Sequence, residues 1–244
     1  MAGERLIYNE SMSNRKVPIV DGEYYHIYNR GNSKQKIFLN KEDYSYFVKL
    51  LYCCNTYKNF SFREDIVKQR IDALDFDQEE TIVSIGAWVL MPNHFHIYIT
   101  TSHKKSDLWQ NETKNHISEF MRKISTAYVK YFNAKYGRTG GLFEAKFKSV
   151  HIKNDNQAKY LFSYIHLNPI KLIDSKWKER GIKDIRRSLE FLSKYRWSSY
   201  SDFLNQSRKE HKILDVKDFP EYFYNLKDFN KEILIWLKYK DEII

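Results

Sequence analysis

Two histidines separated by one residue, His94 and His96, are the first candidates for chemistry in this sequence. They open the stretch HFHIYIT, whose β-branched and aromatic residues predict a strand. Because side chains alternate between the faces of a strand, both imidazoles would project from one face, about 6–7 Å apart, with Phe95 anchored in a core behind them. Two imidazoles placed in this way can bind one metal ion. A solvated surface pair would have the same spacing.

A tyrosine and an asparagine four residues apart, Tyr164 and Asn168, form a second candidate pair. Residues 156–168 have helical character, and Pro169 predicts the end of the helix. The spacing brings both side chains to one helix face, while His166 points elsewhere. An amide oxygen is a suitable metal ligand, and a phenol one turn away could act on whatever the metal binds. A core tyrosine and an asparagine at a helix end would also fit this spacing.

The other histidines add alternative metal ligands, and the absence of several known motifs excludes some classes of enzyme. His103, His116 and His151 are alternative ligands, each also compatible with a solvated or hydrogen-bonded role. The sequence has no paired CxxC elements, no GxxxxGKS/T loop and no GxSxG elbow. Zinc fingers, P-loop ATP hydrolysis and an α/β-hydrolase nucleophile are therefore not supported, and no nucleotide cofactor is expected.

The elements that must position these residues follow from hydrophobic periodicity. Two strands around Met91-Pro92-Asn93 predict a hairpin that carries the histidine pair. The predicted strands span residues 24–29, 81–90, 94–100 and 142–152, and the predicted helices span residues 41–57, 117–132 and 156–168. This order predicts an α+β fold: a ferredoxin-like (RRM-like) antiparallel sheet with helices on one face, plus a C-terminal helical extension.

The chain divides into three predicted parts. Residues 1–20 are expected to form an N-terminal arm, residues 21–172 the domain that carries the candidate site, and residues 173–244 the helical extension. Residues 58–80 are highly charged and fit either an inserted helix or a mobile excursion.

Composition favours a polyanionic partner. The 244 residues carry 41 Lys and Arg against 31 Asp and Glu, a formal net charge of +10, and 16% aromatic residues. Cations beside stacking rings suit single-stranded nucleic acid, although most of these rings could serve a core. Cys53 and Cys54 are adjacent and do not predict a disulfide. With no membrane-length apolar run and no signal-peptide core, we expect a cytoplasmic, nucleoid-associated protein with no membrane partner.

Five stretches carry a family resemblance. They are YHIYNRGN at residues 25–32, MPNHFHIYI at 91–99, AYVKYFNAKYGRTGGLFEAKFKS at 127–149, YLFSYIHLNPIK at 160–171 and WSSY at 197–200. In this order they resemble the small tyrosine transposases with an HUH motif, in particular the REP-associated subgroup of the IS200-like family. MPNHFHIYI is similar to the HUH motif, and YLFSYIHLNPIK to the segment that carries the nucleophile. Residues 58–80 and the tail beyond residue 205 depart from the family pattern.

The resemblance implies a DNA transposase and nuclease that cleaves and rejoins single-stranded or hairpin DNA. Tyr164 would be the nucleophile and would form a 5′-phosphotyrosine intermediate. His94, His96 and Asn168 would bind one divalent ion, Mg²⁺ or Mn²⁺. The protein would act as a monomer or homodimer. The candidate contacts to the DNA backbone are Arg30, Lys34, Arg122, Lys123, Lys146 and Lys148.

Three other functions remain open. An RRM-like binding module would need no metal and would stack bases on Tyr25, Tyr28 and Phe147. A zinc or iron enzyme would combine His94 and His96 with a third histidine. A replication initiator or relaxase would use the same HUH chemistry but usually has further domains, for which this chain has little room.

Overall fold

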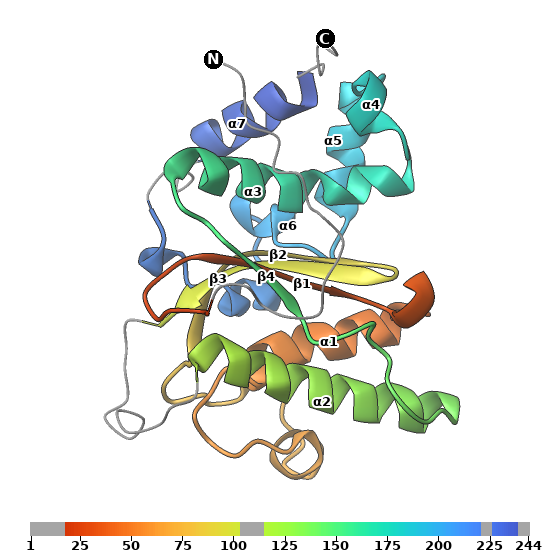
Figure 1. The fold of residues 1–244 in the computed structure, drawn as a ribbon, viewed down its shortest axis with the longest axis vertical. Helices are drawn as coiled ribbons and strands as arrows, with labels where there is room; N and C mark the ends of the chain where they lie inside the picture. The colour runs from red at the N-terminus through yellow and green to blue at the C-terminus, as the bar shows by residue number, and fades with distance from the viewer. Residues whose placement is uncertain (1–17, 103–114, 221–225, 239–244) are drawn as a thin grey trace.

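A four-stranded antiparallel sheet lies at the centre of the computed structural model, which describes residues 18–102, 115–220 and 226–238 (Figure 1). The strands are β1 (Tyr25–Arg30), β2 (Val83–Met91), β3 (His94–Thr101) and β4 (Lys148–His151), in the order β2-β3-β1-β4. The predicted hairpin joins β2 to β3. With its helices the chain is an α+β fold. The predicted N-terminal arm lies outside the described residues except for residues 18–20.

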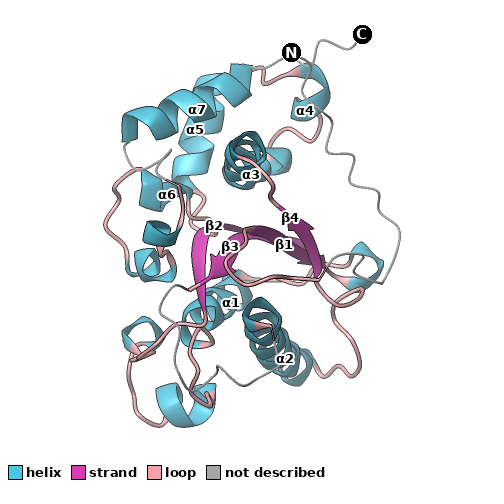
Figure 2. Cartoon of the chain, turned by 60° about the vertical axis from the view of Figure 1, so that its left-hand side comes forward, coloured by secondary structure: helices cyan, strands magenta, loops and turns pink. Residues whose placement is uncertain are grey.

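Helices cover both faces of the sheet (Figures 1 and 2). α1 (Lys41–Cys53) and α2 (His116–Tyr136) pack on one face, and α3 (Asp155–Leu167) packs on the other. This corrects the expectation that helices lie on one face only. The reason is visible in β2, which is buried at every position. A strand with apolar side chains on both faces needs a cover on both.

Two hydrophobic cores result, one on each side of the sheet. The core beneath α1 and α2 is built around Phe47, Phe95, Phe120 and Tyr128. The core beneath α3 contains alternate β2 residues together with side chains of α3 and the C-terminal segment, among them Val89, Phe162 and Phe229. Many of the aromatic rings counted in the sequence therefore stabilise the fold.

The chain after α3 wraps around the second face and one edge of the sheet. The Leu90 amide donates to Trp197 O (2.8 Å), and the Ser199 amide donates to Trp88 O (2.9 Å). Residues 197–199 thereby cover the backbone edge of β2, which would otherwise be open to pairing with another chain. The elements of this region are η5 (Asn168–Leu172), α4 (Trp177–Arg180), α5 (Ile185–Lys194), α6 (Tyr200–Phe203), η6 (Lys209–Ile213), η7 (Val216–Asp218) and α7 (Leu226–Lys238).

Residues 58–80 fold back on α1 as two short turns, η2 (Phe62–Val67) and η3 (Ala73–Asp75). Ile66 and Ala73 pack with Cys53 in a small apolar cluster. Cys53 and Cys54 are both buried and form no disulfide.

β4 and α1 are shorter than the sequence predicts. Only Lys148–His151 pair with β1 as a strand. Before them, the Glu144 amide donates to Arg30 O (3.0 Å) at the end of β1, and the chain then lies beside the loop after β1, which contains η1 (Asn32–Lys34). There the Asn32 amide donates to Leu142 O (2.9 Å). α1 ends at Cys53, four residues before the predicted end at residue 57.

Asp43 joins α1 to α2 through a fully buried carboxylate. It accepts hydrogen bonds from the Leu39 amide (2.8 Å), the Tyr136 hydroxyl (2.7 Å) and the Lys135 ammonium group (2.7 Å). Burial raises the pKa of Asp43, but the hydrogen bonds outweigh burial and hold the pKa below its usual value.

Asp43→Ala is expected to lower the free energy of unfolding by about 3 kcal/mol, because it leaves several buried donors without their acceptor. Since the pKa of Asp43 is lowered in the folded chain, its contribution is complete above about pH 5 and is lost as the pH falls through the lowered pKa. Urea titration measures both effects. Glu42→Ala, at the exposed neighbouring position, should cost less than about 1 kcal/mol. Equal losses for the two variants would contradict this role of Asp43.

Candidate functional site

β3 brings two imidazoles to the sheet face that α3 covers. The ring centroids of His94 and His96 lie 5.0 Å apart, with the ring planes at 80°. Phe95 points to the opposite face and packs against Phe47 at 5.1 Å between ring centroids. The predicted alternation of β3 is therefore present, and the histidine pair shares one face of the sheet.

α3 carries Tyr164 and Asn168 because the sequence defines both of its ends. At the first turn, the Asn154 side chain accepts a hydrogen bond from the Gln157 amide (3.0 Å). At the last turn, Pro169 has no amide hydrogen to continue the α-helix, so the chain tightens into η5. Asn168 keeps helical backbone angles (φ −53°, ψ −39°) and so stays one turn beyond Tyr164.

Tyr164 lies across from the imidazoles. Its ring centroid is 5.3 Å from that of His96 and 6.2 Å from that of His26. Burial raises the pKa of Tyr164 to about 12; the Asn168 amide acts in the opposite direction, and neighbouring tyrosines raise the pKa further. A phenol with this pKa is almost entirely protonated near neutral pH, so its use as a nucleophile requires a cation close by.

Asn168 lies beside both candidate groups. Its amide shifts the pKa values of His94 and Tyr164, yet neither Oδ1 nor Nδ2 makes a hydrogen bond of normal geometry within the described residues. The side chain is fully buried. Buried amide atoms without partners cost free energy, and a bound cation would satisfy the oxygen. Of the four predicted residues, His94, His96 and Tyr164 are linked by ring contacts, and the Asn168 amide is close enough to shift the pKa values of His94 and Tyr164.

The hydrogen-bond partner of each imidazole determines which ring nitrogen carries the hydrogen and which carries the lone pair. His94 Nδ1 lies 2.6 Å from the Asn93 Oδ1 acceptor, so Nδ1 carries the hydrogen and Nε2 the lone pair. Burial lowers the pKa of His94 to about 4, and the positive charge of Lys171 adds to this effect. The neutral imidazole is the form that binds metal ions.

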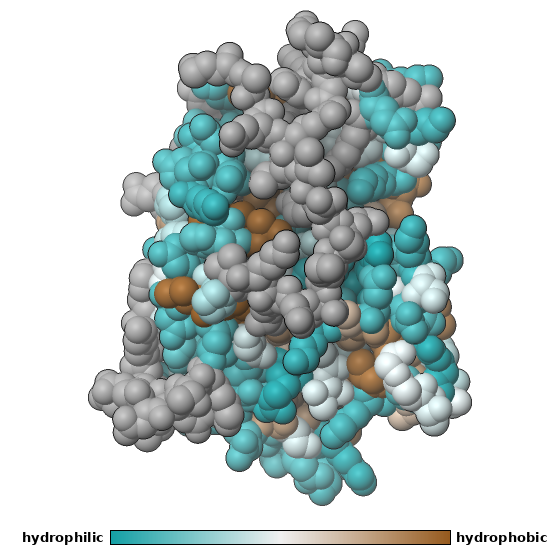
Figure 3. Space-filling model, in the orientation of Figure 1, coloured by the Kyte–Doolittle hydropathy of each residue, from teal (hydrophilic) through white to brown (hydrophobic). Residues whose placement is uncertain are grey.

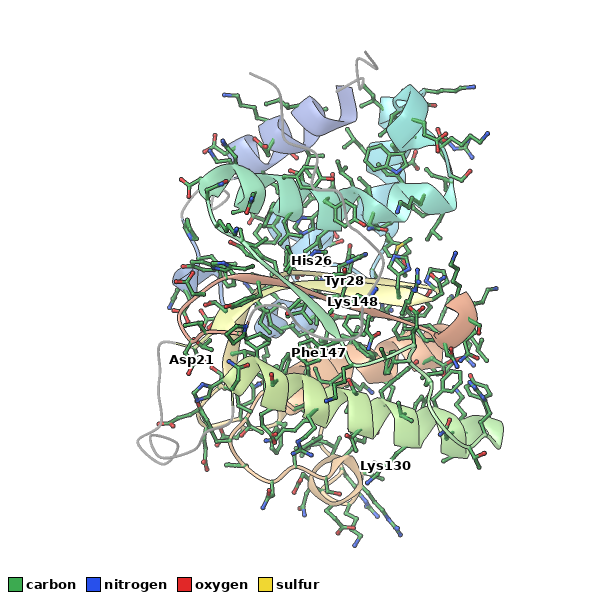
Figure 4. All side chains as sticks on the ribbon, in the orientation of Figure 1. Asp21, His26, Tyr28, Lys130, Phe147 and Lys148 are labelled. Atoms are coloured by element: carbon green, nitrogen blue, oxygen red, sulfur yellow. The ribbon has the colours of Figure 1, made fainter. Side chains whose placement is uncertain are left out.

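A third histidine, His26 on β1, was not identified from the sequence. It is almost fully buried, and its Nε2 lies 2.8 Å from His96 Nδ1. A hydrogen donated from His96 Nδ1 to His26 leaves the lone pair on His96 Nε2, as a metal ligand requires. Figure 4 labels His26 and Tyr28 on β1 at the side of the sheet that faces α3. In the sequence, the alternation in YHIYN indicates only that His26 and Tyr28 share one face of a strand. The contact of His26 with His96 depends on the pairing of β1 with β3, in which Tyr28 lies opposite His96.

The loop after β1 fixes the turn of the histidine hairpin. The Gly31 amide donates to Asn93 O (2.8 Å), and the Ile37 amide donates to Pro92 O (2.9 Å). A Cβ atom at Gly31 would lie 2.2 Å from Gln35 O, so only glycine allows the loop to close this tightly.

A metal centre here would combine two imidazoles with one amide oxygen. Among the described residues, no group of three or more His, Cys, Asp or Glu side chains is placed to hold a metal ion. The set His94, His96 and Asn168 offers a divalent ion two ring nitrogens, with His94 neutral, and a buried amide oxygen that makes no hydrogen bond of normal geometry within the described part of the chain.

A third histidine ligand is not favoured by the contacts. His26 faces Nδ1 of His96, whereas His116 and His151 each pair with a carboxylate at 2.8 Å. His103 lies outside the described residues.

The six predicted DNA-contact residues do not gather at one place. Arg30 pairs with His94 in the strand register and is close to the site, although its guanidinium binds Glu144. Lys148 lies opposite Tyr28 on β4. Lys34 and Lys146 are exposed.

The remaining two contacts are on α2, on the other side of the sheet from the site. Arg122 pairs with Glu119 (2.7 Å). Lys123 is turned inward, where its ammonium group donates to Lys58 O (3.0 Å).

The aromatic residues of the RRM-like alternative are poorly placed for base stacking. Tyr25 is 3% exposed and belongs to the core under α1 and α2, and Phe147 packs against the same core. α3 covers the opposite sheet face, which carries Tyr28. This arrangement does not favour an open stacking surface on the sheet.

Comparisons with known proteins add little. No family model and no curated protein matches the chain. One solved structure, described as the "REP associates tyrosine transposase bound to a REP hairpin", is similar to 82% of this chain and 90% of its own chain, with 16% identity and a TM-score of 0.46. These values are too low to carry the activity or ligand of that protein over to this chain.

His166 points away from the site, as the spacing predicts. Its Nε2 lies 2.8 Å from Ser199 Oγ, and burial lowers its pKa to about 3. Burial also lowers the pKa of His26 to about 3. With His94, three imidazoles remain neutral in the folded chain at pH values where free histidine is charged.

The free energy of unfolding is therefore expected to fall as the pH decreases from about 6.5 to about 4, because these imidazoles take up protons only when the chain unfolds. His166→Phe should make this decline shallower by about 1 kcal/mol per pH unit. Urea titrations at a series of pH values measure the slope. The same slope in both proteins would contradict burial of a neutral His166.

Proposed function

We propose that the protein is a DNA transposase and nuclease of the HUH tyrosine type, which cleaves and rejoins single-stranded or hairpin DNA. One observation carries the proposal: the imidazole pair of β3 and the phenol and amide of α3 meet on the same face of the sheet. The five motifs that resemble the REP-associated tyrosine transposases support it. The strand order β2-β3-β1-β4, with the connections β-α-β-β-α-β, also agrees with the ferredoxin-like sheet expected for that family.

His94, His96 and Asn168 would hold one Mg²⁺ or Mn²⁺ ion, each through the atom left available by its neighbours. When bound, the ion would polarise the scissile phosphate and offset the charge that develops on it. His26 and Asn93 orient the two imidazoles. They are positioning residues in this proposal.

Tyr164 would attack the phosphorus atom of a DNA phosphodiester. A bond forms between Tyr164 Oη and phosphorus, and the bond from phosphorus to the 3′-oxygen breaks. The phenol loses its proton, and the departing 3′-oxygen gains one, so the products are a 5′-phosphotyrosine and a free 3′-hydroxyl. Attack of a 3′-hydroxyl on the phosphotyrosine reverses the step and rejoins strands without ATP.

The substrate is proposed to be single-stranded or hairpin DNA because a paired strand would obstruct access to a tyrosine held on a helix. The net charge of +10 favours a polyanion and predicts binding that weakens as salt increases. The face in Figure 3 is mainly hydrophilic with small separate apolar patches. No described helix has the length and apolarity needed to cross a bilayer.

Incubation with labelled single-stranded hairpin DNA and Mn²⁺ is expected to give a protein–DNA adduct that survives denaturation. Tyr164→Phe should abolish the adduct, because phenylalanine has no hydroxyl to form the ester. Tyr160→Phe is the matched control, since Tyr160 lies one turn earlier on α3 with its ring centroid 6.1 Å from that of Tyr164. An adduct that survives Tyr164→Phe would assign the nucleophile to another residue.

Binding of Mn²⁺ without DNA tests the metal ligands separately. His96→Ala and Asn168→Ala should each weaken Mn²⁺ binding by at least about tenfold in calorimetric titration, because each removes one ligand of three. His151→Ala is the control, since His151 is paired with Glu23 away from this set. Chelation with EDTA should stop adduct formation. Unchanged affinity in both ligand variants would refute this metal centre.

A further inference from the structure

Lys171 places a cation beside the ring of the candidate nucleophile, Tyr164. It belongs to η5, the short helix that begins with Asn168, and it follows that amide by three residues. Its Nζ lies 5.9 Å from the centroid of the Tyr164 ring. Asn168, Pro169 and Ile170 are buried, so the backbone that carries Lys171 is anchored in the core. The backbone position of Lys171 is therefore set by the same turn that sets the proposed metal ligand.

Among the residues that the structure describes, no carboxylate compensates this ammonium group. In the described part of the chain Lys171 has no ion pair and no hydrogen bond, although its side chain is partly buried. Burial lowers the pKa of Lys171, and no acidic group acts in the opposite direction. Arg30 differs, because its charge is offset by Glu144. A partly buried cation without a counterion is costly, and an anionic ligand would offset that cost.

Lys171 also acts on one imidazole of the histidine pair. Its positive charge contributes to the lowered pKa of His94. A divalent cation held by His94 and His96 would be repelled by the ammonium group for the same reason. An anion between the two cations removes this repulsion. A phosphate bound next to Tyr164 would therefore be close to Lys171, whose Nζ lies 5.9 Å from the Tyr164 ring centroid.

We propose that Lys171 binds a non-bridging oxygen of the scissile phosphate next to Tyr164, and is a catalytic residue of the DNA cleavage proposed above. The inference rests on that proposed function. Lys171 forms and breaks no covalent bond. Its ammonium group donates a hydrogen bond to the phosphate and stabilises the negative charge that grows as the phenol oxygen approaches.

The test compares Lys171→Met, which keeps the length of the side chain and removes its charge, with Lys176→Met at an exposed position five residues later. With hairpin DNA and Mn²⁺, the rate of adduct formation should fall by about 10²–10³-fold in Lys171→Met. Lys171→Arg should recover a large part of that rate, and Lys176→Met should retain it. A rate in Lys171→Met equal to that of the unmodified protein would overturn the proposal.

A second measurement separates a phosphate contact from a structural role. Without DNA, Lys171→Met should bind Mn²⁺ at least as tightly as the unmodified protein, because a repelling charge is removed. A variant that had lost its fold would bind Mn²⁺ more weakly. Weaker Mn²⁺ binding in Lys171→Met, with an unchanged unfolding free energy, would contradict the proposed repulsion and overturn the inference.

If neither the unmodified protein nor its variants form a DNA adduct, the proposed function is refuted. A third measurement still tests the role of Lys171 in that case. Inorganic phosphate is then titrated into the Mn²⁺-loaded protein by calorimetry. Lys171→Met should bind phosphate about tenfold more weakly than Lys176→Met, the loss expected for one charge-assisted hydrogen bond. Equal phosphate affinity would overturn the assignment of Lys171 as an anion ligand.

Discussion

The docking of α3 on the sheet is the constraint on which the candidate site depends. β3 supplies imidazoles and α3 supplies a phenol and an amide, and neither element holds a complete set. The site exists only while α3 keeps its rotation and its height above β3. Apolar packing of Phe162 and Leu161 against the β2 face supplies attraction between the two layers. Such packing alone is not directional, so polar contacts are needed to define the register.

One buried polar contact supplies that direction between α3 and the sheet, and a second acts within the sheet. Ser199 Oγ accepts a hydrogen bond from the Trp88 amide at 3.0 Å and lies 2.8 Å from His166 Nε2, so one hydroxyl joins the edge of the sheet to α3. On the other side of the site, His26 and His96 join β1 to β3 at 2.8 Å. Both contacts are enclosed, where hydrogen bonds are strong and their loss is costly. α3 is thus tied to the sheet by the Ser199 hydroxyl within an apolar interface, and the histidines of the site are tied to each other within the sheet.

Local periodicity explains which parts of the site could be predicted from the sequence. The shared face of His94 and His96 follows from strand alternation, and the one-turn separation of Tyr164 and Asn168 follows from helix geometry. His26 and Lys171 could not be found in this way. The contact of His26 with His96 spans 70 residues and depends on strand register. The position of Lys171 depends on the change from α-helix to η5 at Pro169. The second helical layer could have been anticipated from β2, whose continuous apolar run VSIGAWVLM has no polar face.

The cover over the edge of β2 has a consequence for the order of events during synthesis. A nascent chain folds from its N-terminus, so the histidine hairpin and then the tyrosine helix leave the ribosome before residues 197–199 do. Until Ser199 arrives, His166 lacks the hydroxyl that ties α3 to Trp88, and β2 keeps an open edge. The candidate site residues are thus translated early and assembled late. An unfinished chain still attached to its ribosome would carry all four candidate side chains without the Ser199 contact that ties α3 to the sheet.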